Sequence, residues 1–248
     1  MNGYMNVMAT GQSITGPEDF DPTGVVVVAV VLGVIGFVAV LVMLRHQRTQ
    51  TERLVAWAER AGFASLDPEG ETVQGLMPLL LDVMRMAWQR PTGVYVGYAA
   101  RGHRETFEVY LVQVLGMVGP EVVERLVVVC RGFEGKLPAF ELRPSNWMSH
   151  AIHGQGGNCA PPGKFAERYY VFARDKEGVR NLLSDKVQAL LLESPNLAAV
   201  VGGNLAGVYD HSRTQPRDLE RFVQTTVALA SVLRKRAIAF SPSAAQFT

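Results

Sequence analysis

The sequence predicts an α+β fold, in which one N-terminal transmembrane helix precedes a domain whose helices pack on an antiparallel sheet. Residues 25–44 are twenty in a row without a charged or polar side chain. Between Val94 and Cys130 the chain is rich in β-branched residues that alternate with period two, as strands do. Nearer the C-terminus, apolar residues recur at helical spacing. We therefore expect a tail at 1–23, a transmembrane helix at 24–45, a stalk helix at 46–62, an α+β domain at 63–240 and a C-terminal tail at 241–248.

The apolar run has the length that a membrane span requires. At about 1.5 Å rise per residue, roughly 20 residues cross a hydrocarbon core of about 30 Å. No Lys or Arg precedes Arg45, whereas Arg48 and Arg53 follow it closely. Because cations beside a span stay on the cytoplasmic side, these arginines predict a single-pass protein of the cytoplasmic membrane. The N-terminus is expected outside and the large domain in the cytoplasm.

Small residues lie on one side of the predicted span. Ala29, Gly33 and Gly36 stand at i, i+4 and i+7, so that they share a helix face on which a neighbouring helix can approach closely. Gly and Ala are also common in transmembrane helices that have no packing partner. The expected partners are the lipid bilayer and other membrane protein subunits.

The first part of the domain is predicted to be helical and then extended. Leu54, Trp57, Ala58 and Ala61 keep helical spacing in the stalk, and residues 76–87 resemble a short apolar helix. Strands are expected at 94–98, 106–115 and 122–130, separated by Gly or Pro turns. This succession predicts an antiparallel meander.

The second part mixes strands and helices. Further strands are expected at 137–143 and 165–174, on either side of a Gly- and Pro-rich surface loop. Asp175 is placed to cap one helix, Gly202 and Gly203 predict a hairpin turn, and the last helix starts near Pro216. Strands followed by helix, hairpin and helix favour α+β over a nucleotide-binding βαβ arrangement.

Few residues suggest chemistry. His150, His153 and Cys159 lie within ten residues of one another in the surface loop, and Cys130 could add a fourth metal ligand. Zinc sites usually show closely paired ligands on a rigid turn or helix, which this loop lacks, so we expect a solvated loop, no metal and no cofactor. The formal net charge of +1 gives no basic surface for nucleic acid.

Two other groupings are interpreted as structural. Asp210, His211 and Ser212 are adjacent, whereas a catalytic triad is assembled from residues remote in sequence, so they are expected in a solvated connector. Glu105 and Glu108 have no third partner in the sequence pattern and are expected on an exposed strand face.

Several segments resemble a set of bacterial membrane-anchored proteins of uncharacterised function. The resemblance rests on Leu137–Pro144, on Phe165–Leu191, on the Gly-Gly hairpin that ends at Val208-Tyr209, and on a final helix that closes on a basic cluster. It implies a bacterial source and an anchor followed by an α+β domain. It implies no catalytic or ligand-binding residue, and the loop at 144–163 is longer here than in that set.

These observations favour a membrane-tethered, non-enzymatic interaction domain or accessory subunit of a bacterial membrane protein complex. The alternative is a membrane-bound enzyme, or a ligand or metal sensor, that uses the loop from His150 to Cys159. Identifying co-purifying proteins or assaying for zinc would distinguish the two classes.

Overall fold

The computed structural model describes residues 22–87, 91–119, 121–133, 137–145, 157, 159–212 and 216–240. The chain divides into two compact units, Met1–Glu52 and Arg53–Thr248. The described part of the first unit is helical throughout. The second unit contains the sheet and the remaining helices, and it confirms the predicted α+β class.

The first helix, α1 (Pro22–Arg60), is one continuous helix through the predicted span and stalk. Within the described residues, no helix combines the length and the apolar character that crossing a bilayer requires. The predicted transmembrane helix and the single-pass location in the cytoplasmic membrane are therefore wrong. The orienting role predicted for Arg45, Arg48 and Arg53 stays a prediction. The three arginines are exposed on α1, and Arg48 Nε donates to Glu52 Oε1 over 2.9 Å.

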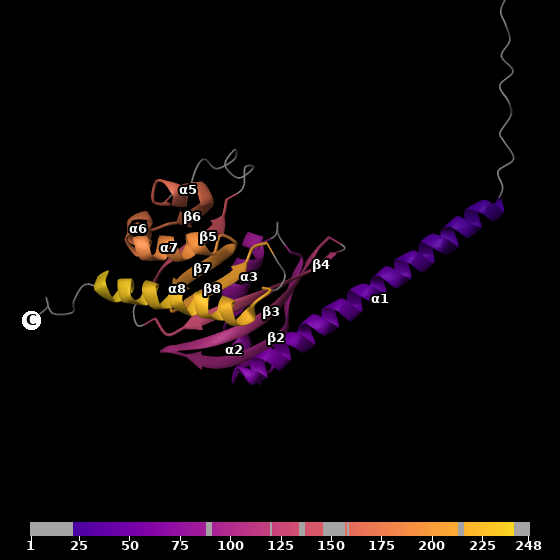
Figure 1. Cartoon of the computed structure of the whole chain (residues 1–248), viewed down its shortest axis with the longest axis horizontal. Helices are drawn as coiled ribbons and strands as arrows, with labels where there is room; N and C mark the ends of the chain where they lie inside the picture. Colours follow the sequence, from indigo (N-terminus) through magenta and orange to yellow (C-terminus); the bar gives the residue numbers. More distant parts are fainter. Residues whose placement is uncertain are drawn as a thin grey trace, which may run out of the picture. The chain divides into compact units, whose positions relative to one another are not determined.

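The second unit is built on an antiparallel sheet of eight described strands, in the order β1-β2-β3-β4-β8-β7-β5-β6 (Figure 1). The strands are β1 (Ala64–Leu66), β2 (Gly93–Arg104), β3 (Phe107–Val118), β4 (Glu121–Arg131), β5 (Leu137–Pro144), β6 (Tyr169–Ala173), β7 (Leu197–Gly203) and β8 (Leu205–Asp210). Strands β2, β3 and β4 form the predicted meander. The later strands join out of sequence order, because β8 pairs with β4 and β7 pairs with both β8 and β5.

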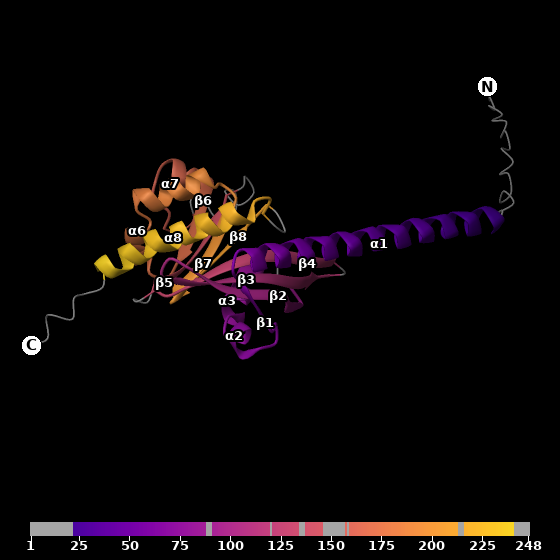
Figure 2. The ribbon, with the colours of Figure 1, turned by 60° about the horizontal axis from the view of Figure 1, so that its bottom comes forward.

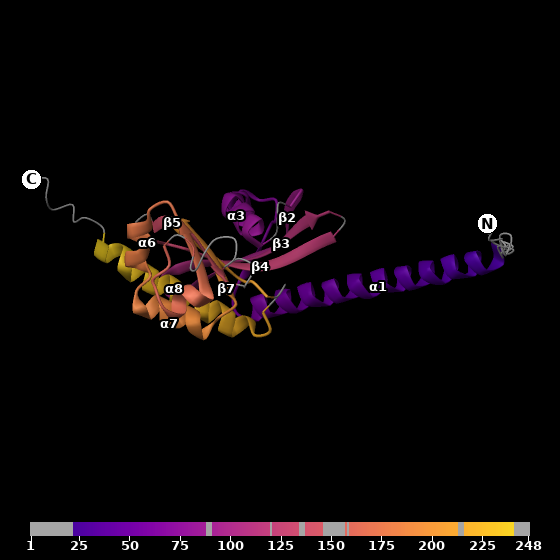
Figure 3. The same ribbon diagram turned by 90° about the horizontal axis from the view of Figure 1, so that it is seen from above.

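Helices lie on both faces of this sheet (Figures 2 and 3). On one face, here the α8 face, α6 (Lys176–Leu182), α7 (Asp185–Glu193) and α8 (Leu219–Phe240) cover the larger core, to which the end of α1 adds Leu54 and Ala58. The opposite face, here the α3 face, carries α3 (Met77–Ala87) and a smaller core. Two short helices, α2 (Glu71–Gln74) and α5 (Lys164–Arg168), complete the described elements.

Several predicted details are confirmed. Asp175 caps α6, since its Oδ1 accepts a hydrogen bond from Gly178 N over 2.9 Å. The stripe of α8 is buried as its spacing predicts, with Phe222, Val223 and Val227 each less than a tenth exposed. The hairpin between β7 and β8 forms, with Gly203 at φ +62°, a left-handed conformation that glycine adopts without strain.

The predicted strand at 165–174 and the predicted continuous helix after Asp175 are wrong in part. Residues 164–168 form α5, and only Tyr169–Ala173 is extended. Tyr169 fixes this boundary, because its hydroxyl donates to Leu191 O at 2.9 Å and to Ser194 O at 2.8 Å. The predicted helix breaks between α6 and α7, where Leu183 leaves helical geometry at ψ 53°.

Candidate functional site

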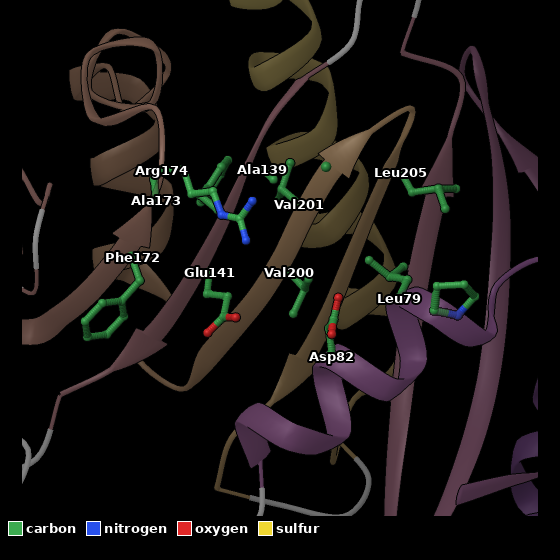
Figure 4. A pocket seen from close by; sticks show the side chains of 13 residues that line it. Leu79, Asp82, Ala139, Glu141, Phe172, Ala173, Arg174, Val200, Val201 and Leu205 are labelled. Atoms are coloured by element: carbon green, nitrogen blue, oxygen red, sulfur yellow. The ribbon is translucent and has the colours of Figure 1, made fainter.

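The α3 face of the sheet is only partly covered. Helix α3 contacts β3, β7 and β8, and a hollow of about 610 Å³ opens between it and the β5–β6 side of the sheet (Figure 4). Its lining comes from five elements: Pro78, Leu79, Asp82, Ala139, Phe140, Glu141, Phe172, Ala173, Arg174, Val200, Val201, Gly202 and Leu205. Among the lining residues, Ala139, Ala173 and Gly202 have small side chains or none. A Cβ added to Gly202, for example, would lie 3.5 Å from Ala139 Cβ.

Three charged side chains stand around this apolar floor. Figure 4 shows Glu141 on β5 and Asp82 on α3, with Val200 of β7 between them, and Arg174 beyond the end of β6. Burial raises the pKa of the Glu141 carboxyl, the nearby Asp82 carboxylate adds to the rise, and Arg143 opposes it. The hollow therefore places two carboxyl groups and one guanidinium group around an apolar floor.

A second group of polar residues, here the cation cluster, lies on the same face beside the hollow and consists of Arg125, Arg143, Tyr209 and His211. Arg125 lies two residues before Val127 in β4. Val127 pairs with Tyr209 of β8, and Tyr209 pairs on its other side with Ala198 of β7. Arg143 follows Leu142, which pairs with Ala199. Strands β4, β8 and β5 thus bring the four side chains to one end of the α3 face, across the small side chain of Ala198.

Three contacts hold members of the cation cluster in place. Arg125 Nη2 donates to the carbonyl oxygen of His211 over 3.4 Å, and the rings of Tyr209 and His211 lie 6.3 Å apart between centroids. The guanidinium carbon of Arg143 lies 5.0 Å from the centroid of the Phe172 ring. Tyr209 is fully buried, whereas the other three side chains are half-buried.

Burial and charge perturb these groups together. Burial lowers the pKa of His211, Arg125 and Arg143 lower it further, and Asp210 opposes them. Burial raises the pKa of the Tyr209 hydroxyl, which both arginines oppose. Burial also lowers the pKa of the Arg125 guanidinium. The cluster therefore holds two cations, a neutral phenol and an imidazole that resists protonation.

The predicted metal-site candidates are not brought together in the described structure. His150 and His153 lie outside the described residues. Cys159 is buried, its thiol donates to Val171 O over 3.5 Å, and burial raises its pKa. Cys130 is buried in β4, where burial raises the pKa of its thiol to about 12. Within the described ranges, no three potential ligands form a group that could hold a metal ion.

The other sequence candidates form local contacts. Asp210 Oδ1 accepts hydrogen bonds from Ser212 N at 2.9 Å and from Ser212 Oγ at 2.8 Å, so the carboxylate serves a turn rather than a triad. Glu108 lies within ion-pair distance of Arg101 and Arg131 and accepts a hydrogen bond from the Tyr110 hydroxyl. The prediction of a solvated connector missed that His211 is half-buried. Continuing the alternation of β8 past Tyr209 would have placed its side chain on the same face.

Helix α1 carries a second candidate surface. Its first half exposes twelve large apolar side chains, each between 49% and 65% exposed: Val26, Val27, Val28, Val30, Val31, Leu32, Val34, Ile35, Phe37, Val38, Leu41 and Val42. Ala29, Gly33 and Gly36 are exposed between them, and a Cβ added at either glycine would meet no atom within 4 Å. The predicted close-packing role of these three residues stays a prediction.

Comparisons with protein-family models, with curated proteins and with solved structures found no match to this chain. The class defined by fold and site is an α+β protein with an eight-stranded antiparallel sheet and a surface that is apolar along half of one helix. Any further statement about function depends on the residues of this chain alone.

Proposed function

We propose that this chain is a non-enzymatic interaction subunit. Its helix α1 would pack among apolar helices of a partner protein and so hold the chain there. The observation that carries the proposal is the apolar surface of α1 between Val26 and Val42. The described residues of the first unit supply nothing that covers it. The membrane tether expected from the sequence is not part of this proposal.

The energetics of this surface favour a covered state. Fully burying a Val, Leu, Ile or Phe side chain stabilises by about 1.5–3 kcal/mol. Twelve side chains that are about half exposed therefore retain on the order of 10 kcal/mol of unfavourable contact with water. A patch of this extent marks an interaction site in a folded protein.

The distribution of apolar residues defines the kind of partner. An amphipathic helix needs one neighbour, because its polar face stays in water, whereas α1 between Val26 and Val38 has no polar face. One neighbouring helix would cover only one side, so the proposed partner contributes helices on at least two sides. The Ala29, Gly33 and Gly36 side would admit the closest approach.

The state of the thiols argues only against cysteine-based catalysis. A reactive cysteine needs a lowered pKa and access to solvent. Cys130 and Cys159 are both buried, and the pKa of each is raised by that burial. Within the described residues, neither thiol has the properties of a nucleophile.

Site-specific photo-crosslinking in the full chain tests the proposal. Val30 and Leu32 are 200° apart around a helix at 100° per residue, so they face nearly opposite sides. A photo-reactive residue at either position should crosslink to apolar helical peptides of the same partner, identified by mass spectrometry. Adducts from one side only, or adducts without a peptide of another protein, would overturn the proposal.

A pair of substitutions adds a matched comparison. Replacing both Gly33 and Gly36 by Leu should weaken recovery of the crosslinked partner at least tenfold, because leucine blocks the close approach. Val31→Leu changes the opposite side of α1 by one methylene and should leave recovery unchanged. Equal recovery from both variants would show that the small residues do not contact the partner.

A further inference from the structure

Three polar atoms of the cation cluster are buried without a hydrogen-bond partner in the described structure. They are the Tyr209 hydroxyl, Arg143 Nε and His211 Nδ1. A buried donor left unpaired costs about 1–3 kcal/mol, so buried polar groups almost always have partners. Three such atoms, on β5, on β8 and directly after β8, indicate that a group outside the described residues pairs with them.

The strand register brings the side chains that carry these three atoms to one place on the α3 face. Tyr209 and His211 are two residues apart at the end of β8 and therefore point to the same face. Arg143 reaches that face from β5, with only Ala198 of β7 between β5 and Tyr209. Arg125 reaches it from β4 and donates to the backbone of His211. Three strands thus present donor groups around one small residue.

The charge of the cluster identifies the missing partner. Among the described residues, no carboxylate lies within ion-pair distance of Arg143. Two acidic groups that act on Arg125 also accept other hydrogen bonds: Asp210 accepts from Ser212, and Glu124 accepts from Gln113 Nε2 at 2.6 Å. Glu141 lines the hollow, and its charge, like those of Asp210 and Glu124, acts against an anion at the cluster. Burial is the largest cause of the lowered pKa of His211, and the positive charges of Arg125 and Arg143 lower it further.

We propose that Arg125, Arg143, Tyr209 and His211 form a binding site for an oxyanion group, a carboxylate or a phosphate. The guanidinium groups would supply the charge, because arginine recognises planar carboxylate and phosphate oxygens. The Tyr209 hydroxyl and the His211 imidazole would each donate one neutral hydrogen bond. This site is independent of the α1 interface and would hold whether or not α1 has a partner.

The position of the site suits a group at the end of a longer ligand. The neighbouring hollow has a volume of about 610 Å³ and an apolar floor next to Glu141. The rest of such a ligand would therefore be apolar or cationic. The shared chemistry of the ligand is therefore an oxyanion at one end. Whether that anion is a phosphate or a carboxylate is an outcome of the experiment.

Calorimetric titration of the full chain tests the site with two probes, inorganic phosphate and succinate, at constant ionic strength set with sodium chloride. Saturable binding of at least one probe is expected, and the tighter of the two identifies the anion class. Arg143→Gln should weaken that binding at least tenfold, since a hydrogen bond to a charged group contributes about 1.5–3 kcal/mol. Arg221→Gln, which changes an exposed arginine of α8 on the opposite face of the sheet, is the matched control and should bind as the wild type does.

A second variant separates binding from folding. Tyr209→Phe removes only a hydroxyl that has no partner, so the fold should be as stable as the wild type or more stable. Its affinity for the anion should nevertheless fall several-fold, and the anion should raise its melting temperature less than that of the wild type. The proposal is overturned if neither probe saturates, or if Arg143→Gln and Tyr209→Phe both bind as the wild type does.

Discussion

Burial determines the reactivity of the cysteine side chains. Cys130 lies in β4 with no exposed surface, and its pKa of about 12 compares with an ordinary value of 9.0. The raised pKa leaves less thiolate near neutral pH than an exposed cysteine has. In β4, Cys130 is therefore a small core residue.

Alkylation kinetics test this interpretation. Cys130 and Cys159 in the folded chain should react with iodoacetamide at pH 8 at least a hundredfold more slowly than in urea, because both are buried and their pKa values are raised. Intact-mass spectrometry over time would measure the two rates. Rapid modification of either cysteine before unfolding would show that its surroundings open to solvent.

The lowered pKa of His211 predicts that the free energy of unfolding depends on pH. Its folded pKa is lowered from 6.5 by burial, Arg125 and Arg143, with Asp210 opposing, so the unfolded chain binds a proton more readily. The stabilisation from neutral His211 is complete above the unfolded pKa and is lost as pH falls from about 6.5 towards the folded pKa. The free energy of unfolding should therefore decrease as the pH falls from about 7 to about 5.

Melting temperatures across this range isolate the contribution of His211. Between pH 7 and pH 5, the melting temperature of the wild type should fall further than that of His211→Gln, because the variant lacks the titrating imidazole. His103→Gln changes an exposed histidine and should follow the wild type. Parallel curves for the wild type and His211→Gln would contradict the assigned cause.

At the scale of elements, the seating of α3 on the sheet depends on a glycine in β8. A Cβ added to Gly207 would lie 2.9 Å from Leu79 Cδ2, closer than carbon atoms normally approach. Gly207→Ala should therefore destabilise by about 1–2 kcal/mol, because α3 must shift or Leu79 must leave its rotamer.

Gly202→Ala is the matched control in the paired strand. Its added Cβ would lie 3.5 Å from Ala139 Cβ, an ordinary contact, and a strand favours alanine over glycine. Chemical denaturation should show Gly202→Ala equal to or more stable than the wild type. Equal destabilisation by the two variants would show that glycine at 207 has no packing role.

Local elements could be predicted from the sequence because their signals are local. The meander, the Asp175 cap and the β7–β8 hairpin follow from alternation, a capping residue and a turn glycine. The break at Leu183 and the helical turn of α5 could not, because tertiary contacts such as those of the Tyr169 hydroxyl decide them. The prediction of a membrane span depended on apolar length alone.

At the scale of the whole molecule, the order of strands in the sheet could not be predicted from the sequence. Pairing of β4 with β8 joins residues about eighty positions apart, and no local pattern indicates it. Arg125, Arg143 and His211 meet only because of this order, so the sequence offered no signal for the cation cluster. The hollow likewise depends on α3 crossing strands that are distant in the chain.

The same long-range construction makes the end of α1 part of the core of the second unit. Leu54 and Ala58 are fully buried, the rings of Trp57 and Phe63 lie 5.8 Å apart, and Arg104 Nη2 donates to Ala61 O at 2.6 Å. A fragment of residues 53–248 keeps these contacts, whereas a fragment of residues 63–248 loses them.

We expect the 53–248 fragment to unfold cooperatively in denaturant and the 63–248 fragment to be at least about 3 kcal/mol less stable, since truncating one buried leucine costs about 2–5 kcal/mol. Leu54→Ala in the full chain should reproduce most of this loss, whereas Arg53→Ala, at an exposed position, should not. Fragments of equal stability would place the boundary of the folded domain after α1. A stability difference reproduced by Leu54→Ala would place it within α1, before Leu54.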